Sequence, residues 1–217
     1  MGIAELNNEK GTLTISALLH FYGDAAYEEI SFHAAEDINA HWNIPGGHVV
    51  INDRRYKVVF DVKGFFAPDL TEKEVNENDD PLNNYFRVEE FASGNISFVD
   101  GINSNTGYLK LDNLLNNSTT AAHEFGHTLG LLHPEDLDLR GRGVPGIMYP
   151  RGTITDPEFQ YDLHAAAGAI GGTMNPFHRK VLQEDIDDLH LEKLYFNQGG
   201  RAVIGAFTSE WHDRHVE

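Results

Sequence analysis

The chain has 217 residues, of which 41% are hydrophobic and 23% are charged, and it has no apolar run of the roughly 18 residues that a membrane span needs. The composition is typical of one soluble globular domain. Against 34 acidic residues there are only 16 basic ones, and the net charge of −18 disfavours binding to nucleic acid or to an anionic membrane surface. The absence of cysteine excludes disulfides, thiolate metal sites and a cysteine nucleophile, so any metal must bind His, Asp or Glu.

The first half of the chain alternates β-rich and helical patterns. Residues 12–22 are rich in β-branched and apolar side chains, which predicts a buried strand. Apolar residues at four-residue spacing predict a helix over residues 25–42, with Ile30, Ala34, Ile38 and Trp42 on its buried stripe. The later segments are a hairpin at 48–52 and 56–62, a polar surface loop at 71–84, and short strands at 85–91, 95–100 and 107–112.

The second half contains two predicted helices around a region rich in glycine and proline. A helix is predicted over residues 119–132, with an N-cap from Asn116-Asn117-Ser118 and an apolar stripe at Ala122, Phe125, Leu129 and Leu132. Residues 133–176 are predicted to be irregular, and residues 183–196 to form a last helix. The order predicts a single α/β (α+β) domain over residues 1–217, with 201–217 as a candidate C-terminal appendage.

The helix over residues 119–132 contains two histidines four positions apart, in the run His123-Glu124-Phe125-Gly126-His127. Residues at this spacing leave the same face of an α-helix, so both imidazoles can reach one metal ion. Glu124 lies beside that ion, where its carboxylate can deprotonate a metal-bound water and pass the proton to a leaving amine. Neutral imidazole suits zinc, and three protein ligands leave a fourth position open for the water.

The residues after this helix supply a third histidine, His133. For His133 to return to the same ion, the chain must leave the helix after Leu129, and Gly130 can adopt the positive φ that such a turn requires. We therefore predict one zinc ion as cofactor, bound by His123, His127 and His133.

The full pattern His-Glu-x-x-His-x-x-Gly-x-x-His, from His123 to His133, resembles the signature of the metzincin zinc metalloproteases. Met148, within residues 146–150, resembles the methionine turn of that family, where the methionine forms an apolar floor beneath the zinc. The Met-Tyr-Pro order is similar to that of the matrixin branch. In other branches a tyrosine that touches the metal stands where this chain has Pro150.

The resemblance covers residues 12–196 and implies a twisted, mixed, mostly parallel sheet with an active-site helix and a C-terminal helix. It also implies a substrate cleft that crosses the zinc between an edge strand and the segment after Met148. An extended protein or peptide substrate would pair with the edge formed by Asn95, Ile96, Ser97, Phe98 and Val99. The wall of the main specificity pocket would come from residues 149–154, including Tyr149, Pro150 and Arg151, with Arg151 influencing which side chains fit.

The chain also departs from the matrixin pattern. The step from His133 to Met148 is longer than is usual, which predicts an insertion at residues 136–145. No His-x-Asp pattern for a second, structural zinc precedes the motif, and the cysteine that keeps matrixins latent is absent. Residues 100–105 offer oxygen atoms for calcium, but nothing else in the sequence supports a calcium site.

These observations predict a zinc endopeptidase that hydrolyses peptide bonds in proteins through a zinc-bound water activated by Glu124. The resemblance implies a secreted or extracellular protein, whereas residues 1–21 lack the basic start and long apolar core of a secretory signal. Two alternatives remain open: a proteolytic effector or toxin domain with one narrow protein target, and a catalytically inactive, zinc-stabilised binding domain. The sequence does not specify the substrate, an inhibitor partner or the oligomeric state.

Overall fold

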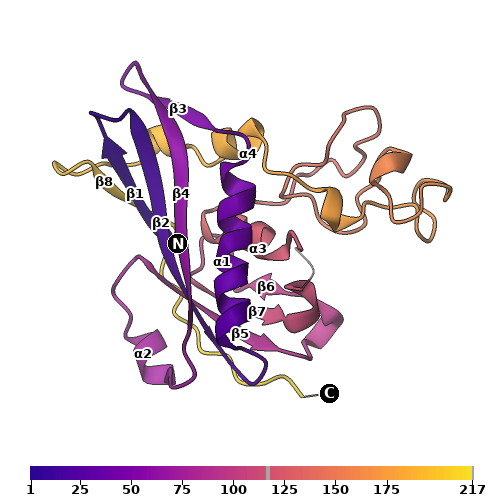
Figure 1. The fold of residues 1–217 in the computed structure, drawn as a ribbon, viewed down its shortest axis with the longest axis horizontal. Helices are drawn as coiled ribbons and strands as arrows, with labels where there is room; N and C mark the ends of the chain where they lie inside the picture. Colours follow the sequence, from indigo (N-terminus) through magenta and orange to yellow (C-terminus); the bar gives the residue numbers. More distant parts are fainter. Residues whose placement is uncertain (116–117, 217) are drawn as a thin grey trace.

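The computed structural model describes residues 1–115 and 118–216 and contains a mixed α/β domain with a curled sheet (Figure 1). The strands are β1 (Gly2–Asn7), β2 (Thr12–Tyr22), β3 (His48–Ile51), β4 (Arg54–Phe66), β5 (Asn83–Glu89), β6 (Phe98–Val99), β7 (Thr106–Lys110) and β8 (Arg201–Ile204). The helices are α1 (Glu28–Asn43), α2 (Glu72–Asn76), α3 (Thr120–Thr128) and α4 (Gln183–Asp188). Asn116 and Asn117, which were predicted to help cap α3, lie outside the described residues.

The sheet is parallel at its centre and antiparallel at its edges, as predicted for a mixed sheet. Within the described residues its main path is β3-β4-β2-β5-β7-β6, and β4, β2, β5 and β7 run parallel. Because β4 occupies one edge of β2 along residues 12–21, β1 and β5 share the other edge of β2. At the far end β6 pairs with β7, and no other described strand pairs with its outer edge, which leaves room there for a further strand.

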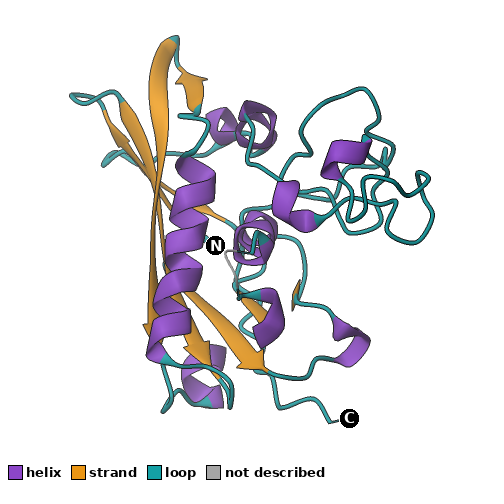
Figure 2. Cartoon of the chain, turned by 45° about the vertical axis from the view of Figure 1, so that its right-hand side comes forward, coloured by secondary structure: helices purple, strands orange, loops and turns teal. Residues whose placement is uncertain are grey.

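Helices α1 and α3 lie on the same side of the sheet (Figure 2). Buried and partly exposed residues alternate along β2, as expected for a sheet with one packed face. The predicted stripe on α1 is confirmed, because Ile30, Ala34, Ile38 and Trp42 are all buried in the main core. The predicted hairpin at 48–62 is also confirmed as β3 and β4, although β4 continues to Phe66.

Three segments near the N-terminal half differ from the prediction. Strand β1 was not predicted, and it forms because it can pair with both β2 and β8, which buries Ala4. Helix α1 begins at Glu28 rather than at residue 25, because Tyr27 is still extended. The loop predicted over 71–84 contains α2, whose first turn is closed by a capping box between Thr71 and Glu74.

The strand predicted over residues 95–100 is reduced to β6, Phe98–Val99. Gly94 and Asn95 both have positive φ and turn the chain before the strand starts. The Oγ of Ser97 accepts the backbone N–H of Lys110 at 3.0 Å, a donor that a longer strand would have paired with a carbonyl. The strand predicted over 107–112 is β7, and it gives way to a 3-10 turn at Leu111–Asn113.

The long C-terminal helix predicted over residues 183–196 is wrong beyond Asp188. Helix α4 stops there, His190 takes a left-handed conformation with φ 49°, and a 3-10 turn follows at Leu191–Lys193. Leu189 and Leu191 are both buried, and residues two apart lie on opposite faces of a helix. The chain therefore has to leave the helix between them to bury both side chains.

The segment from 134 to 182, here called the loop lobe, projects from the helix side of the domain (Figure 1). Its part up to residue 176 was predicted to be irregular. This is confirmed, since the regular structure described there is a 3-10 turn at Pro157–Phe159, the start of another at Pro176–His178, and isolated bridges. Residues 201–216 return to the sheet, where β8 pairs with β1 and the Trp211 ring stacks on Tyr22 at 4.5 Å. No described helix combines the length and the apolar character that crossing a membrane requires.

Candidate metal centre and cleft

Helix α3 is buried along its whole length between α1 and the loop lobe. The indole Nε1 of Trp42 in α1 donates to the carbonyl of Ala122 at 3.0 Å, which fixes the two helices against each other. The helix was predicted to reach residue 132, but it ends at Thr128. Leu132 is 69% exposed and lies outside the buried stripe.

Gly130 determines how α3 ends. It has φ 107°, a left-handed value that favours glycine, and the predicted turn is confirmed. The N–H of Gly130 donates to the carbonyl of His127 and the N–H of Leu131 donates to the carbonyl of Gly126, which is the Schellman pattern. This turn reverses the chain so that His133 comes back to the helix face that carries His123 and His127.

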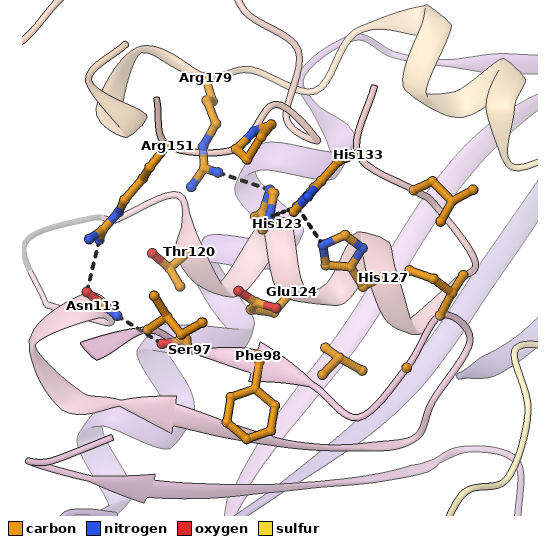
Figure 3. A pocket seen from close by; sticks show the side chains of 16 residues that line it. Ser97, Phe98, Asn113, Thr120, His123, Glu124, His127, His133, Arg151 and Arg179 are labelled. Atoms are coloured by element: carbon orange, nitrogen blue, oxygen red, sulfur yellow. Dashed lines mark hydrogen bonds between the residues drawn. The ribbon is translucent and has the colours of Figure 1, made fainter. Parts of the chain in front are cut away.

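The three histidines meet at one point, as Figure 3 shows. The Nε2 atom of His133 lies 3.1 Å from the Nε2 of His123 and 3.1 Å from the Nε2 of His127. A tetrahedral zinc ion bound at roughly 2.0–2.1 Å would hold its nitrogen ligands roughly 3.3–3.4 Å apart, so the spacing suits such an ion. In the part of the chain that the structure describes, these three histidines are the side chains that lie close enough together, as a group of three or more, to hold one metal ion.

Backbone carbonyls orient two of these rings. The Nδ1 of His123 lies 2.8 Å from the carbonyl oxygen of Ile147, and the Nδ1 of His127 lies 2.7 Å from that of Leu131. A carbonyl can only accept, so in His127 Nδ1 carries the proton and Nε2 presents a lone pair. The Nδ1 of His123 also lies 3.0 Å from the Nη1 of Arg179, which can only donate, and the shorter contact with the Ile147 carbonyl favours the same tautomer there. Burial lowers the pKa of all three imidazoles, which keeps them neutral and able to bind a cation. The arrangement fits a divalent metal ion.

Glu124 lies beside the histidines on the floor of the cleft. Its side chain is buried, and no cation of the described residues forms an ion pair with it. Burial raises the pKa of the carboxyl to about 8, and the nearby charge of Arg179 partly opposes this rise. Burial therefore makes this carboxylate a stronger base than a solvated one, whereas a cation bound beside it would lower its pKa and favour the charged form.

Met148 packs against the underside of α3, as expected for a methionine turn. A Cβ atom at Gly126 would overlap the Met148 sulfur and would lie 3.2 Å from both the Met148 methyl group and the Trp42 ring. The glycine between the two helical histidines is therefore required by the close approach of this methionine. The residue before Met148 is Ile147, whose carbonyl orients His123, so one turn supports both the floor and a ligand.

The cleft above these residues has a volume of about 650 Å³. Of the residues predicted to contact substrate, Ile96, Ser97, Phe98, Val99, Pro150 and Arg151 line it, whereas Asn95 and Tyr149 do not. Asn95 lies in the 3-10 turn before β6, and Tyr149 faces the site only through its carbonyl, which accepts from Arg179 at 3.1 Å. The Nη2 of Arg151 donates to the Asn113 side chain at 3.1 Å across one end of the cleft.

Arg179 is a lining residue that sequence reasoning missed. It lies near the C-terminal end of the loop lobe and is only 5% exposed. Burial lowers the pKa of its guanidinium to about 10. No local pattern marks this arginine, because its neighbours at the site, Thr119 and Tyr149, are distant in sequence.

The oxygen-rich run at residues 100–105 is engaged in other contacts. The carboxylate of Asp100 lies 2.8 Å from the Nε2 of His212 and accepts the hydroxyl hydrogen bond of Thr106 at 2.5 Å. These contacts tie the C-terminal segment to the sheet. They leave the calcium hypothesis without support from this structure.

The chain matches no protein-family model and no curated protein sequence. The features of this chain that indicate a function are therefore the convergence of the three imidazoles, the buried carboxylate beside them and the cleft above.

Proposed function

We propose that this protein is a zinc endopeptidase related to the metzincins, and to the matrixins among them. The observation that carries the proposal is the convergence of the Nε2 atoms of His123, His127 and His133 beside the buried carboxylate of Glu124. The Schellman turn at Gly130 and the packing of Met148 beneath α3 support the family relationship. The ion would be held by the three histidines.

When bound, zinc would supply Lewis-acid polarisation of the substrate carbonyl and a lower pKa for water. The chain's own contribution is proton transfer by Glu124. Its carboxylate takes a proton from the attacking water and delivers it to the nitrogen of the breaking peptide bond, which leaves as an amine. The carbonyls of Ile147 and Leu131 hold two of the imidazoles in the required tautomer throughout.

The free edge of β6 would position the substrate. A peptide laid along Ile96–Val99 would form main-chain hydrogen bonds with this edge, while side-chain pockets along the cleft select the sequence. The volume of the cleft, about 650 Å³, is large enough for more than one substrate side chain, which suits cleavage within a chain.

The test is incubation of the zinc-loaded protein with a mixed peptide library, with products identified by mass spectrometry. We expect internal cleavage that a chelator abolishes and that added zinc restores. Glu124→Gln should lower the rate by about 10²–10⁴-fold while the protein keeps its zinc, because the substitution removes only the proton carrier. Glu90→Gln is the matched surface control and should retain full activity.

A zinc-stabilised binding domain is the competing outcome. It would bind one zinc ion and remain folded, yet leave every library peptide intact under all metal conditions. Retention of cleavage by Glu124→Gln would contradict the assigned role of the carboxylate even if the protein proved to be a protease.

A further inference from the structure

Arg179 is a buried cation that forms no ion pair within the described residues, although the charge of Glu124 acts on it from beyond ion-pairing distance. Its Nε donates to the Thr119 hydroxyl at 3.0 Å and its Nη1 donates to the Tyr149 carbonyl at 3.1 Å. Among the described residues, none accepts a hydrogen bond from Nη2, and no carboxylate lies within ion-pairing distance of this guanidinium. A charge withdrawn from water without a counter-ion is costly, so this arrangement indicates a ligand that supplies the missing anion.

The position of the guanidinium decides which part of a substrate it can reach. Nη1 lies 3.0 Å from the Nδ1 of His123, whereas the metal-facing atom of that ring is Nε2. These two nitrogens are on opposite sides of the imidazole, so Arg179 stands behind the ligand and away from the reacting carbonyl. A side chain of the substrate, rather than its scissile carbonyl oxygen, is the group that can meet Nη2.

One end of the cleft surrounds this free donor. Figure 3 shows Arg179, Arg151 and Thr120 around the same end, to one side of the three histidines. Arg151 adds a second positive charge there, and the hydroxyl of Thr120 adds a polar group that can donate. The chain has a net charge of −18, so the two arginines at one end of the cleft make the local charge there opposite in sign to that of the whole protein.

We propose that this end of the cleft binds the carboxylate of an aspartate or glutamate side chain of the substrate, so that cleavage occurs on the amino side of an acidic residue. The proposal rests on the proposed endopeptidase function and names its substrate class. A guanidinium offers the planar pair of N–H donors that a carboxylate accepts. Binding of the acid would complete the hydrogen bonding of Arg179.

The order of residues on α3 places the acidic residue after the scissile bond. Thr120 lies one helical turn before His123 and Glu124, so the pocket is adjacent to the carboxylate that delivers the proton. That proton goes to the nitrogen of the residue following the scissile bond. The side chain of the same residue is therefore the one nearest to Arg179.

The main test uses the wild-type zinc-loaded protein and C-terminally amidated decapeptides that differ at one position, which is Glu, Gln or Leu. Amidation removes the terminal carboxylate, so any charge preference must come from the side chain. We expect the Glu peptide to be cleaved at least about tenfold faster than the Gln peptide, with Glu as the first residue of the new N-terminus. Equal rates for Glu and Gln would overturn the proposal and leave the endopeptidase function standing.

A binding measurement separates this proposal from the proposed function. Zinc-loaded Glu124→Gln protein is titrated with fluorescently labelled Glu and Gln peptides and read by fluorescence anisotropy. We expect the Glu peptide to bind at least about tenfold more tightly, whether or not the wild type cleaves either peptide. Absence of cleavage by the wild type would thus count against the protease, and absence of selective binding would count against the acidic pocket.

Two variants assign the preference to Arg179. Arg179→Gln should bring the rates and affinities for Glu and Gln peptides together, whereas Arg179→Lys should retain part of the preference because it keeps the charge. Arg140→Gln removes an exposed arginine of the loop lobe that pairs with Asp138, and it should leave the preference unchanged. Zinc content and thermal unfolding of each variant establish that it is folded. A preference that persists in folded Arg179→Gln protein would reject the assignment.

Discussion

The region up to His133 contains β1 to β7 and the helices α1 and α3 that pack on the sheet. It is built differently from the loop lobe at 134–182. In the first region, parallel strands and the helices α1 and α3 satisfy the backbone through regular ladders and turns. In the loop lobe, the chain is held by isolated links such as Met174 N–H to the Thr153 carbonyl and Lys180 N–H to the Pro145 carbonyl. The first region carries the three converging histidines, and the second contributes part of the wall of the cleft and, at Ile147 and Met148, the contacts beneath α3.

Under the proposed function, this division would separate the residues that bind the metal and activate water from the residues that select the substrate. His123, Glu124 and His127 lie on one short helix, where their relative positions follow from helix geometry. Arg179 reaches the same cleft because the long excursion of the loop lobe brings it back to Tyr149, next to Met148. We infer that substitutions in the loop lobe away from Ile147 and Met148 would change selectivity and leave the proposed metal site in place, whereas substitutions beneath α3, at Gly126 or Met148, would affect both.

The largest expected effect tests whether the two regions unfold together. Phe125→Ala removes a buried ring that lies 6.1 Å from Trp42 and 6.4 Å from Phe60, and it should lower the free energy of unfolding by about 3–5 kcal/mol. Met174→Ala empties a buried position in the loop lobe and should cost less in the same measurement, because this lobe can open locally.

Urea unfolding followed by tryptophan fluorescence makes this comparison, since Trp42 and Trp211 both lie outside the loop lobe. Leu163→Ala, at an exposed position of the lobe, is the control and should change stability by less than about 0.5 kcal/mol. Equal losses for Phe125→Ala and Met174→Ala would mean that the lobe and the sheet unfold as one cooperative unit.

The next prediction concerns Asp185, which joins α4 to the methionine turn. Its carboxylate accepts the N–H of Leu182 at 2.7 Å and lies against Gly146, and burial raises its pKa to about 6. The unfolded chain releases this proton near pH 4, so between about pH 4 and pH 6 the folded state holds more protons. Stability from this group therefore falls as the pH rises through that window, by up to about 3 kcal/mol.

Asp185→Asn should remove this dependence, because an amide does not titrate and its oxygen can still accept from Leu182. Urea unfolding at pH 4.5 and pH 7.5 measures it. The free energy of unfolding of the variant minus that of the wild type should be larger at pH 7.5 than at pH 4.5. A difference between the two proteins that stays constant with pH would show that Asp185 is ionised throughout.

A third prediction probes the contact that joins the regions beneath the metal centre. Gly126→Ala places a methyl group against the sulfur of Met148 and beside Trp42, and the resulting overpacking should cost about 1–3 kcal/mol and weaken zinc binding. Met148→Ala makes room for that methyl group. In a double-mutant cycle the two changes should therefore cost less together than the sum of their separate costs, and strict additivity would contradict the contact.

Much of the first region could be predicted from the sequence because its signals are local. The buried stripe of α1, the hairpin of β3 and β4, and the turn at Gly130 follow from residues within a few positions of one another. The convergence of His133 on the two helical histidines was predicted from the same local spacing. Short-range physics, namely helix geometry and the left-handed freedom of glycine, is sufficient for these features.

The failures have a different physical origin. Helix α4 was predicted to continue to residue 196, but burial of both Leu189 and Leu191 against the core ends it, a tertiary effect that helical propensity does not contain. Strand β1 depends on partners from both ends of the chain. Arg179 depends on contacts with Thr119 and Tyr149 that span the loop lobe, and no local pattern encodes them.

The smallest predicted effect is the release of a proton from Glu124 when zinc binds. It connects α3 with the loop lobe, because the charge of Arg179 acts on Glu124. With its pKa raised to about 8 by burial, this carboxyl carries a proton at pH 7 in the metal-free protein, whereas the three histidines are already neutral. A dication beside Glu124 favours its charged form and expels that proton. Zinc binding at pH 7 should therefore release about one proton more from the wild type than from Glu124→Gln, and zinc affinity should rise with pH until about pH 8.

Calorimetric titration with zinc in buffers of different ionisation enthalpy measures this release. Since the charge of Arg179 lowers the pKa of Glu124, Arg179→Gln should move the rise in zinc affinity to higher pH. The shift would place a residue of the loop lobe in electrostatic control of the base on α3, although the two are far apart in sequence. If the wild type and Glu124→Gln release equal numbers of protons, Glu124 is ionised before the metal arrives, and the charge of Arg179 affects substrate selection alone.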